Sequence, residues 1–284
     1  MRHPLIAALA AAAILTAGCQ RGRDADVERA LDAVSVIDEA NLNDVMLASA
    51  DPAEAVAYFA KASAAKPDRL DLRRGLAAAL IRAKQPAQAV AAWEQVAAHP
   101  QAMNEDRVDL ADALIRAGDW SRAEAVLDAV PPTYETHQRY RLAAMIADSN
   151  QEWSKADAFY ETAAGLTTRP AGVLNNWGYS KLSRGDAPGA ERLFDRALDY
   201  DPGLFTAKNN LVMARGARRA YDLPVVQMTQ TERAMLLHTA ALSAIKQGDV
   251  STGRALLSQA IETHPQYFEA AARSLDALEA SVVN

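Results

Sequence analysis

The thiol of Cys19 is the most reactive side chain that the sequence offers, and it belongs to the only cysteine among 284 residues. A single thiol cannot form a disulfide within the chain. Three roles stay open: a small buried hydrophobic residue, a nucleophile, or a site of covalent attachment. A nucleophilic cysteine needs a basic partner held beside it, so the residues around Cys19 decide between these roles.

The residues before Cys19 have the pattern of a secretory signal peptide. Arg2 gives a short basic region, and the run from Leu5 to Gly18 holds fourteen residues without a charge. As a helix with a rise of ~1.5 Å per residue, this run would span roughly 21 Å, which is short of a hydrocarbon layer of ~30 Å. The sequence therefore predicts a signal peptide over residues 1–18 rather than a membrane-spanning helix.

The stretch LTAGC, Leu15 to Cys19, resembles the lipobox of bacterial lipoproteins, with Thr16 in place of the usual leucine. The resemblance implies that Cys19 receives a diacylglycerol, that the chain is cut just before it, and that residues 19–35 tether the lipid to the folded part. It also implies a protein anchored to a membrane and facing the periplasm. Gln20 at the next position favours the outer membrane. An ordinary signal peptide with an incidental cysteine is the alternative.

Beyond Cys19, the sequence contains no constellation of residues typical of catalysis. Its histidines are isolated from one another, at His3, His99, His137, His238 and His264. The patterns H-E-x-x-H, G-x-x-x-x-G-K and G-x-S-x-G, which indicate zinc, phosphate and nucleophile sites, do not occur. The carboxylates alternate with Arg and Lys, which is typical of solvated helix faces. We therefore predict a protein that is not an enzyme and that needs no metal or cofactor.

The composition excludes a nucleic-acid-binding protein and favours helices. The net charge is −6, and removal of residues 1–18, which contain Arg2, leaves −7, whereas nucleic-acid binding requires a basic face. Alanine is abundant and aromatic residues make up 6%. Alanine has the highest helix propensity and lets helix axes approach closely. We expect a chain of closely packed helices.

A period of about 34 residues runs through the sequence and indicates a helical-repeat fold. A small residue recurs at spacings of 34, 34, 33 and 34, at Ala55, Ala89, Ala123, Ala156 and Ala190. A large apolar residue follows each alanine four places later, at Phe59, Trp93, Leu127, Tyr160 and Phe194. Residues four apart share one face of a helix, so each pair should face a neighbouring helix.

The segment from Gly172 to Pro202 resembles the tetratricopeptide repeat. It has a large and a small residue at Trp177-Gly178, a glycine turn, and then the pattern A-x3-F-x2-A. The resemblance implies an all-α fold, a right-handed superhelical solenoid of helix-turn-helix repeats, because a single repeat cannot bury its apolar face alone. We predict this solenoid over residues 36–266, with a C-terminal capping helix and tail over residues 267–284.

The sixth repeat breaks the pattern, because Pro224 stands where the small alanine should fall. An interior proline costs a helix ~3 kcal/mol or more, so the second helix should be absent or displaced over residues 217–230. The helical pattern resumes behind the capping-box spacing of Thr229 and Glu232. The break is basic, with Arg215, Arg218 and Arg219. It is either an extended connector packed along the solenoid or a loop that contacts a partner protein.

The resemblance to tetratricopeptide repeats implies that the first helices of the stacked repeats line a concave groove, in which peptides bound by that family usually lie. The repeat frame places on it Arg141, Asn175, Tyr179, Asn209 and Met213, which with the three arginines of the break are the candidate partner-binding residues. Asp148 and other acids face the groove too, so its charge is mixed. Asn175 and Asn209 either contact a peptide or tie neighbouring helices to each other by hydrogen bonds.

The C-terminal half, from NNWGYSKLSRGD to the broken repeat with YDLP and MTQTER, resembles the tight-adherence protein D (TadD) lipoproteins. The resemblance implies a scaffold or assembly factor of Flp (type IVc) pili, which supports the outer-membrane secretin as pilotins do. The implied partners are the secretin or other pilus-assembly proteins, and the membrane through the lipid. A component of outer-membrane barrel assembly and a regulator of peptidoglycan synthases are the alternatives.

Overall fold

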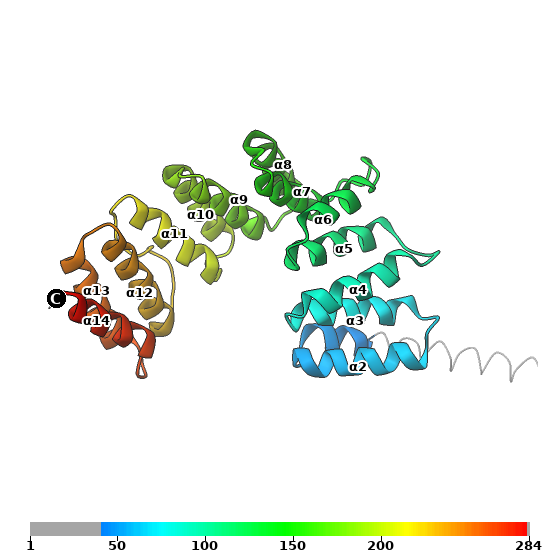
Figure 1. Cartoon of the computed structure of the whole chain (residues 1–284), viewed down its shortest axis with the longest axis horizontal. Coiled ribbons are helices and arrows are strands. Elements are labelled where there is room, and N and C mark those ends of the chain that lie inside the picture. Colours follow the sequence, from blue (N-terminus) through cyan, green and yellow to red (C-terminus); the bar gives the residue numbers. More distant parts are fainter. Residues whose placement is uncertain (1–40, 283–284) are drawn as a thin grey trace, which may run out of the picture. The chain divides into compact units, whose positions relative to one another are not determined.

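The computed structural model describes residues 41–282, and within this range every regular element is a helix (Figure 1). The described part begins with a helix over residues 41–48. The helices that follow are α2 (Pro52–Ala65), α3 (Leu70–Arg82), α4 (Pro86–Ala97), α5 (Asn104–Arg116), α6 (Trp120–Asp128), α7 (His137–Ser149), α8 (Trp153–Gly165), α9 (Ala171–Ser183), α10 (Ala187–Tyr200), α11 (Phe205–Ala217), α12 (Gln230–Lys246), α13 (Val250–Thr263) and α14 (Glu269–Val282). The prediction of an all-α fold is confirmed. Residues 1–18 and Cys19, with the predicted tether, lie outside the described residues.

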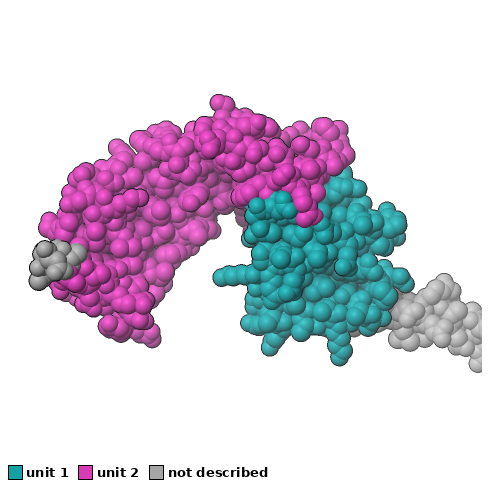
Figure 2. Space-filling view, in the orientation of Figure 1, with its two compact units in different colours: residues 1–119 teal, residues 120–284 magenta. Residues whose placement is uncertain are grey.

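The chain divides into two compact units, residues 1–119 and residues 120–284, which Figure 2 shows in teal and magenta. We call them unit 1 and unit 2. The described helices of unit 1 end with α5, and unit 2 begins with α6. The boundary therefore falls between the two helices of one predicted repeat, within the range 36–266 over which the sequence predicts the solenoid.

The repeat frame is visible in the turns that follow the first helices. Their left-handed residues follow one another at spacings of 34, 33, 34 and 34, at Lys84 (φ 57°), Gly118 (φ 81°), Gln151 (φ 61°), Gly185 (φ 86°) and Arg219 (φ 61°). Each turn also contains a backbone hydrogen bond that closes the helix end, such as Asp186 N–H to the Lys181 carbonyl at 2.9 Å. This bond is typical of helix ends with a left-handed residue. The break in the sixth repeat thus comes after the turn at Arg219.

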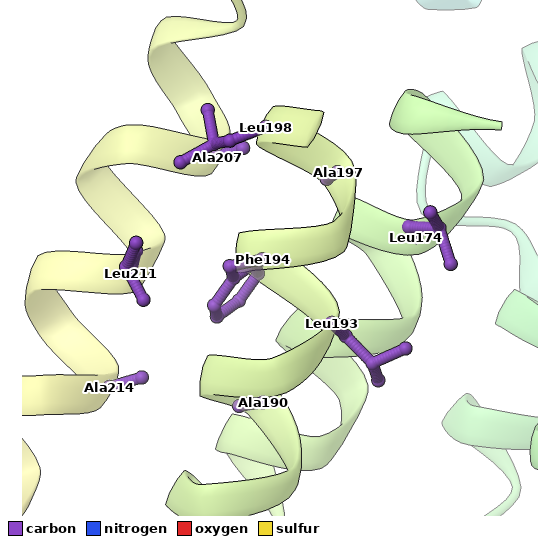
Figure 3. Close-up of a cluster of buried hydrophobic side chains, with 9 residues drawn as sticks. All are labelled: Leu174, Ala190, Leu193, Phe194, Ala197, Leu198, Ala207, Leu211 and Ala214. Carbon is purple, nitrogen blue, oxygen red and sulfur yellow. The ribbon is translucent and has the colours of Figure 1, made fainter. Parts of the chain in front are cut away.

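The small and large residues of the repeat meet as the sequence predicts. Phe194 of α10 is fully buried in a cluster with residues of α9 and α11 (Figure 3). A Cβ added to Gly178 of α9 would lie 2.6 Å from Phe194 Cε1, so the aromatic ring occupies the space that a larger residue would need. The five repeat alanines are all fully buried. Burial of one such aromatic side chain contributes about 1.5–3 kcal/mol.

An extended segment replaces the second helix of the sixth repeat. Helix α11 ends at Ala217 and α12 begins at Gln230, behind the capping box formed by Thr229 and Glu232. The segment covers α11 and α12 with Tyr221, Leu223 and Met228, which pack on the buried Val212, Leu236 and Ala240. These side chains take over part of the burial that a helix supplies in the regular repeats.

The buried Lys208 holds this extended segment to α11. The side chain is 2% exposed, and Nζ donates to the Gln227 carbonyl at 2.8 Å and pairs with Glu232 at 3.3 Å. A buried ammonium is tolerated only with such partners. Lys208 of α11 and Glu232 of α12, which lie before and after the segment in the chain, therefore help to fix its path.

Helix α14 packs over the end of unit 2. Ala271 and Leu278 of α14 are buried against Leu237, Ala241 and Leu257 of the two preceding helices. Across residues 41–282, no helix combines the length and the apolar character that a membrane span needs.

Candidate protein-binding face

A row of apolar side chains runs along the first helices of unit 2. Met145, Tyr179 and Met213 occupy equivalent positions of α7, α9 and α11 at spacings of 34 residues, and Leu242 of α12 continues the row. Tyr179 is 56%, Met213 38% and Leu242 46% exposed. We call the surface around these four residues the first-helix face. Large apolar side chains exposed at regular spacing are typical of surfaces that bind other molecules.

Asparagine side chains on this face tie neighbouring first helices together. Asn210 Nδ2 of α11 donates to Asn175 Oδ1 of α9 at 3.0 Å, and Thr239 Oγ1 of α12 donates to Asn209 Oδ1 at 2.8 Å. The helix-tying role of Asn175 and Asn209 is thus observed. Each amide group can form more hydrogen bonds than these, so the same residues retain capacity for a bound peptide backbone.

Two cavities open on the first-helix face and collect four of the candidate residues. A cavity of about 400 Å³ between α7, α9 and α11 is lined by Asn175 and Tyr179. A second cavity of about 480 Å³ between α11 and α12 is lined by Asn209 and Met213. Arg141 lies on α7, where Nη1 is 3.6 Å from Met145 Sδ, and it does not line either cavity.

The three arginines of the break line neither cavity and form ion pairs within unit 2. Arg215 Nε is 3.1 Å and Arg218 Nη1 2.6 Å from the carboxylate of Glu191 on α10. Arg219 Nη1 is 2.8 Å from Asp249, to which the Tyr221 hydroxyl also donates. These contacts fasten both ends of the turn after α11. A contact of the arginines with a partner protein stays a prediction.

The sequence did not single out a polar cluster behind the cavity between α7, α9 and α11. Asp148 Oδ1 accepts from Ser180 Oγ at 2.7 Å, and Oδ2 accepts from the buried Tyr160 hydroxyl at 3.0 Å. Burial raises the pKa of the Asp148 carboxyl above its usual value, although both hydroxyl donors act to lower it. The repeat frame placed Asp148 on the groove, but it identified Tyr160 only as a core residue, and the hydroxyl contact gave no signal in the spacing.

A neighbouring carboxylate, Asp157 of α8, has the opposite surroundings. It accepts from Trp177 Nε1 at 2.6 Å, pairs with Lys181 at 2.8 Å, and also binds the Arg184 guanidinium. Burial acts to raise the pKa of the Asp157 carboxyl, but these donors hold it below the usual value. Lys181 and Arg184 are therefore engaged by Asp157 rather than by Asp148.

The first helices of unit 1 present charges that are paired within the unit. Arg74 Nε and Nη2 donate to the two carboxylate oxygens of the buried Asp106 at 2.6 and 2.8 Å. Arg82 donates to the carbonyl oxygens of Met46 and Ala50 at 3.1 and 2.9 Å. These groups serve the packing of unit 1 and leave little capacity for a ligand.

One histidine of unit 2 approaches a hydroxyl, but the pair does not have the arrangement of a catalytic dyad. His238 Nε2 lies 3.0 Å from Ser274 Oγ, whose proton is directed to the Ala270 carbonyl at 2.9 Å. Burial lowers the pKa of His238. Within the described residues, no group of three His, Cys, Asp or Glu side chains could hold a metal ion.

Comparisons with known proteins agree with the repeat architecture. Residues 46–105 match the family model described as tetratricopeptide repeat. No curated protein matches the sequence. Solved structures do resemble the fold. A tetratricopeptide repeat protein from Parabacteroides merdae has a TM-score of 0.52 at 12% identity, and the match covers 81% of this chain and 93% of that one.

Two further structures are similar over most of this chain. The APC/C hetero-tetramer Cut9–Hcn1 gives a TM-score of 0.59 at 12% identity, with 83% of this chain and 48% of that chain covered. Human IFIT1 gives 0.56 at 16% identity, with 80% and 59% covered. This chain therefore spans about half of the Cut9–Hcn1 chain that it matches. At these identities the likeness concerns the fold.

The helix pairs, the recurring turn and these likenesses confirm the predicted fold of tetratricopeptide-type repeats. Solenoids of this type commonly use the surface lined by their repeats to bind other proteins. The class of protein is a helical-repeat scaffold for protein–protein interaction.

Proposed function

We propose that this protein is a non-enzymatic, lipid-anchored scaffold for the assembly of Flp (tight-adherence) pili. Cys19 carries the lipid, the protein faces the periplasm, and the outer membrane is its location. The first-helix face of unit 2 binds the outer-membrane secretin or another pilus-assembly protein and supports it as a pilotin does. The face, rather than a catalytic centre, performs the function.

The row of exposed apolar residues is the observation that carries the binding role. Tyr179, Met213 and Leu242 expose large apolar side chains on three first helices, next to amide groups that can pair with a peptide backbone. An extended segment laid across this row could bury these side chains while its backbone bonds to the asparagines.

The pilus assignment is supported by the sequence of the broken repeat. Its similarity to the TadD lipoproteins includes Tyr221, Thr229 and Glu232, and these residues have defined structural roles here. Tyr221 binds Asp249, while Thr229 and Glu232 cap α12. The resemblance therefore falls on side chains that build the unusual part of the fold.

Affinity purification from detergent-solubilised membranes, followed by mass spectrometry, tests both the pilus assignment and the role of the lipid anchor. We expect the lipidated chain to enrich a secretin and other pilus-assembly proteins, and a Cys19→Ser chain to enrich them less. Enrichment of barrel-assembly proteins or peptidoglycan synthases instead would refute the pilus assignment and identify one of the two alternatives.

A pair of tyrosines provides a matched control for the face. Tyr179→Asp places a charge on the apolar row, whereas Tyr200→Asp places the same charge at the end of α10, on a side chain of similar exposure, 58% against 56%. We expect the first change to lower partner capture at least about tenfold, since a charge would be buried against apolar surface, and the second to leave it unchanged. Equal capture by both variants would exclude the first-helix face as the binding surface.

A further inference from the structure

The cavity between α7, α9 and α11 has a composition that points to one class of side chain. Among the described residues that line it, Asp148 is the only charged one. The other lining groups include three aromatic side chains, Trp120, Tyr160 and Tyr179, and the amides of Asn175, Asn176 and Asn210. A carboxylate enclosed by aromatic and neutral polar groups is complementary to a cation.

The Asp148 carboxylate has no ion pair with any cationic side chain in the described part of unit 2. Its hydrogen bonds come from two neutral hydroxyls, those of Ser180 and Tyr160. Arg184, whose charge acts on Asp148 and lowers its pKa, binds Asp157 instead. Burial raises the pKa of the Asp148 carboxyl, which shows that the charged form lacks full compensation. Each carboxylate oxygen can still accept a further hydrogen bond.

The aromatic side chains supply the second, independent observation. Trp120 is 36% exposed and Tyr179 56% exposed, so each ring keeps surface that a bound side chain can cover. Aromatic rings bind ammonium and guanidinium groups through their faces and bind the aliphatic stems of Lys and Arg through apolar contact. Exposed rings beside an unpaired carboxylate thus match both parts of such a side chain.

We propose that this cavity is a specificity pocket that takes the Lys or Arg side chain of a bound peptide segment, with Asp148 as the counter-ion and Trp120 and Tyr179 as its apolar walls. The inference rests on the proposed protein-binding function and names the residue that the partner supplies. An acidic side chain would face the carboxylate at close range. A purely apolar side chain would bury Asp148 further without a partner, which is costly.

Small probes test the pocket without knowledge of the partner. The full chain carrying Cys19→Ser is titrated with n-butylammonium, and n-butanol serves as the neutral control of similar size. The indole N–H signal of Trp120 is followed by NMR and assigned with Trp120→Phe. We expect n-butylammonium to shift this signal in a saturable manner and n-butanol to shift it at least about tenfold less. Equal shifts by the two probes would overturn the proposal.

Two carboxylate variants provide the matched comparison. Asp148→Asn keeps the shape and one acceptor oxygen for the two hydroxyls but removes the charge, so it should weaken n-butylammonium binding about tenfold. Asp195→Asn removes a carboxylate whose pKa is also raised by burial but which lies on α10, outside the cavity, and it should leave binding unchanged. Unchanged binding by Asp148→Asn, with the fold verified by circular dichroism, would refute the assignment of Asp148.

Peptide libraries separate this inference from the proposed function. Acetylated nine-residue libraries with a central Lys, Arg or norleucine, and all other positions randomised, are compared for binding to the same chain. A preference of about tenfold for the Lys and Arg libraries, lost in Asp148→Asn, is the expected result. If the libraries bind equally while Tyr179→Asp still abolishes partner capture, the pocket is wrong and the protein-binding face stands. If Tyr179→Asp leaves capture intact, the proposed function is wrong as well.

Discussion

Unit 1 and unit 2 each hold an acidic side chain against a first helix, but the two carboxylates have opposite surroundings. In unit 1, Asp106 accepts two hydrogen bonds from Arg74 and one from the Met103 N–H at 2.7 Å. In unit 2, Asp148 accepts hydrogen bonds from two hydroxyls and has no cation of its own. Burial acts to raise both pKa values, yet the donors to Asp106 hold its pKa below the usual value, whereas that of Asp148 stays above it. The charge of Asp106 is thus balanced by an arginine of the fold, whereas Asp148 lacks a cationic partner and could accept one from a ligand.

The difference extends to the surfaces around the two carboxylates. The first helices of unit 1 use their arginines on Asp106 and on backbone carbonyls. Those of unit 2 expose Tyr179, Met213 and Leu242 in a row beside partly used amides. We infer that unit 2 supplies the binding face and that the paired charges of unit 1 stabilise its own helix stack.

Truncation of the central aromatic residue should destabilise the cores of the two units to a similar extent, and this is the largest effect that we expect. Phe59 and Phe194 are both almost fully buried against a glycine, Gly75 and Gly178 respectively. Phe59→Ala and Phe194→Ala should each lower the free energy of unfolding of their unit by ~3–5 kcal/mol, because the cavity left behind cannot close. Hydrogen exchange resolved by peptide measures each unit separately. The exposed Leu166→Ala is the control, with an expected loss below ~0.5 kcal/mol. A small loss in one unit alone would break the equivalence of the two cores.

Replacement of Arg74 in unit 1 should have the next largest effect on stability, and it tests whether the Asp106 charge depends on its arginine partner. Arg74→Met leaves the buried Asp106 carboxylate without its cation, and removal of one partner of a buried pair typically costs ~3 kcal/mol or more. Arg116→Met removes the exposed partner of Asp112, for which ~0–1 kcal/mol is expected. Urea denaturation monitored by hydrogen exchange in α3 and α5 distinguishes the two. Similar losses for both variants would show that the Arg74–Asp106 pair is no more structural than a surface pair.

The repeat frame could be predicted from the sequence because it depends on residues close together in the chain. The buried alanines, the aromatic residue four places later and the left-handed turn recur at a fixed spacing, so one segment predicts the others. The replacement of the second helix after Arg219 follows from Pro224 in the same local way.

The parts that the sequence did not reveal depend on contacts between distant residues. Ser180 lies 32 residues from Asp148, and Asp249 lies 30 residues from Arg219. Neither pair has a fixed spacing that a repeat pattern would show. The boundary between the units after Asp119 gave no signal either, because the 34-residue period continues across it. The spacing of small and large residues predicts which helices stack. The environment of a charged side chain depends instead on which side chains of the neighbouring repeats contact it.

The smallest effect is also the most direct test of the comparison between Asp106 and Asp148. The native state binds the proton of Asp148 more tightly than the unfolded chain does, since its pKa lies above the ordinary 3.8. Its contribution to stability is therefore fully present below pH 3.8 and is lost as the pH rises through the raised pKa. For Asp106, whose pKa is lowered, the contribution is present above pH 3.8 and is lost as the pH falls through the lowered pKa.

The two asparagine variants should consequently change with pH in opposite directions. As the pH rises from 3 to 7, Asp148→Asn should gain stability relative to the native chain, whereas Asp106→Asn should lose stability relative to it. Thermal unfolding of each variant and of the native chain over this range gives the difference directly. If both differences had the same sign, the two carboxylates would share one kind of environment, and the distinction between a structural acid in unit 1 and a ligand-binding acid in unit 2 would fail.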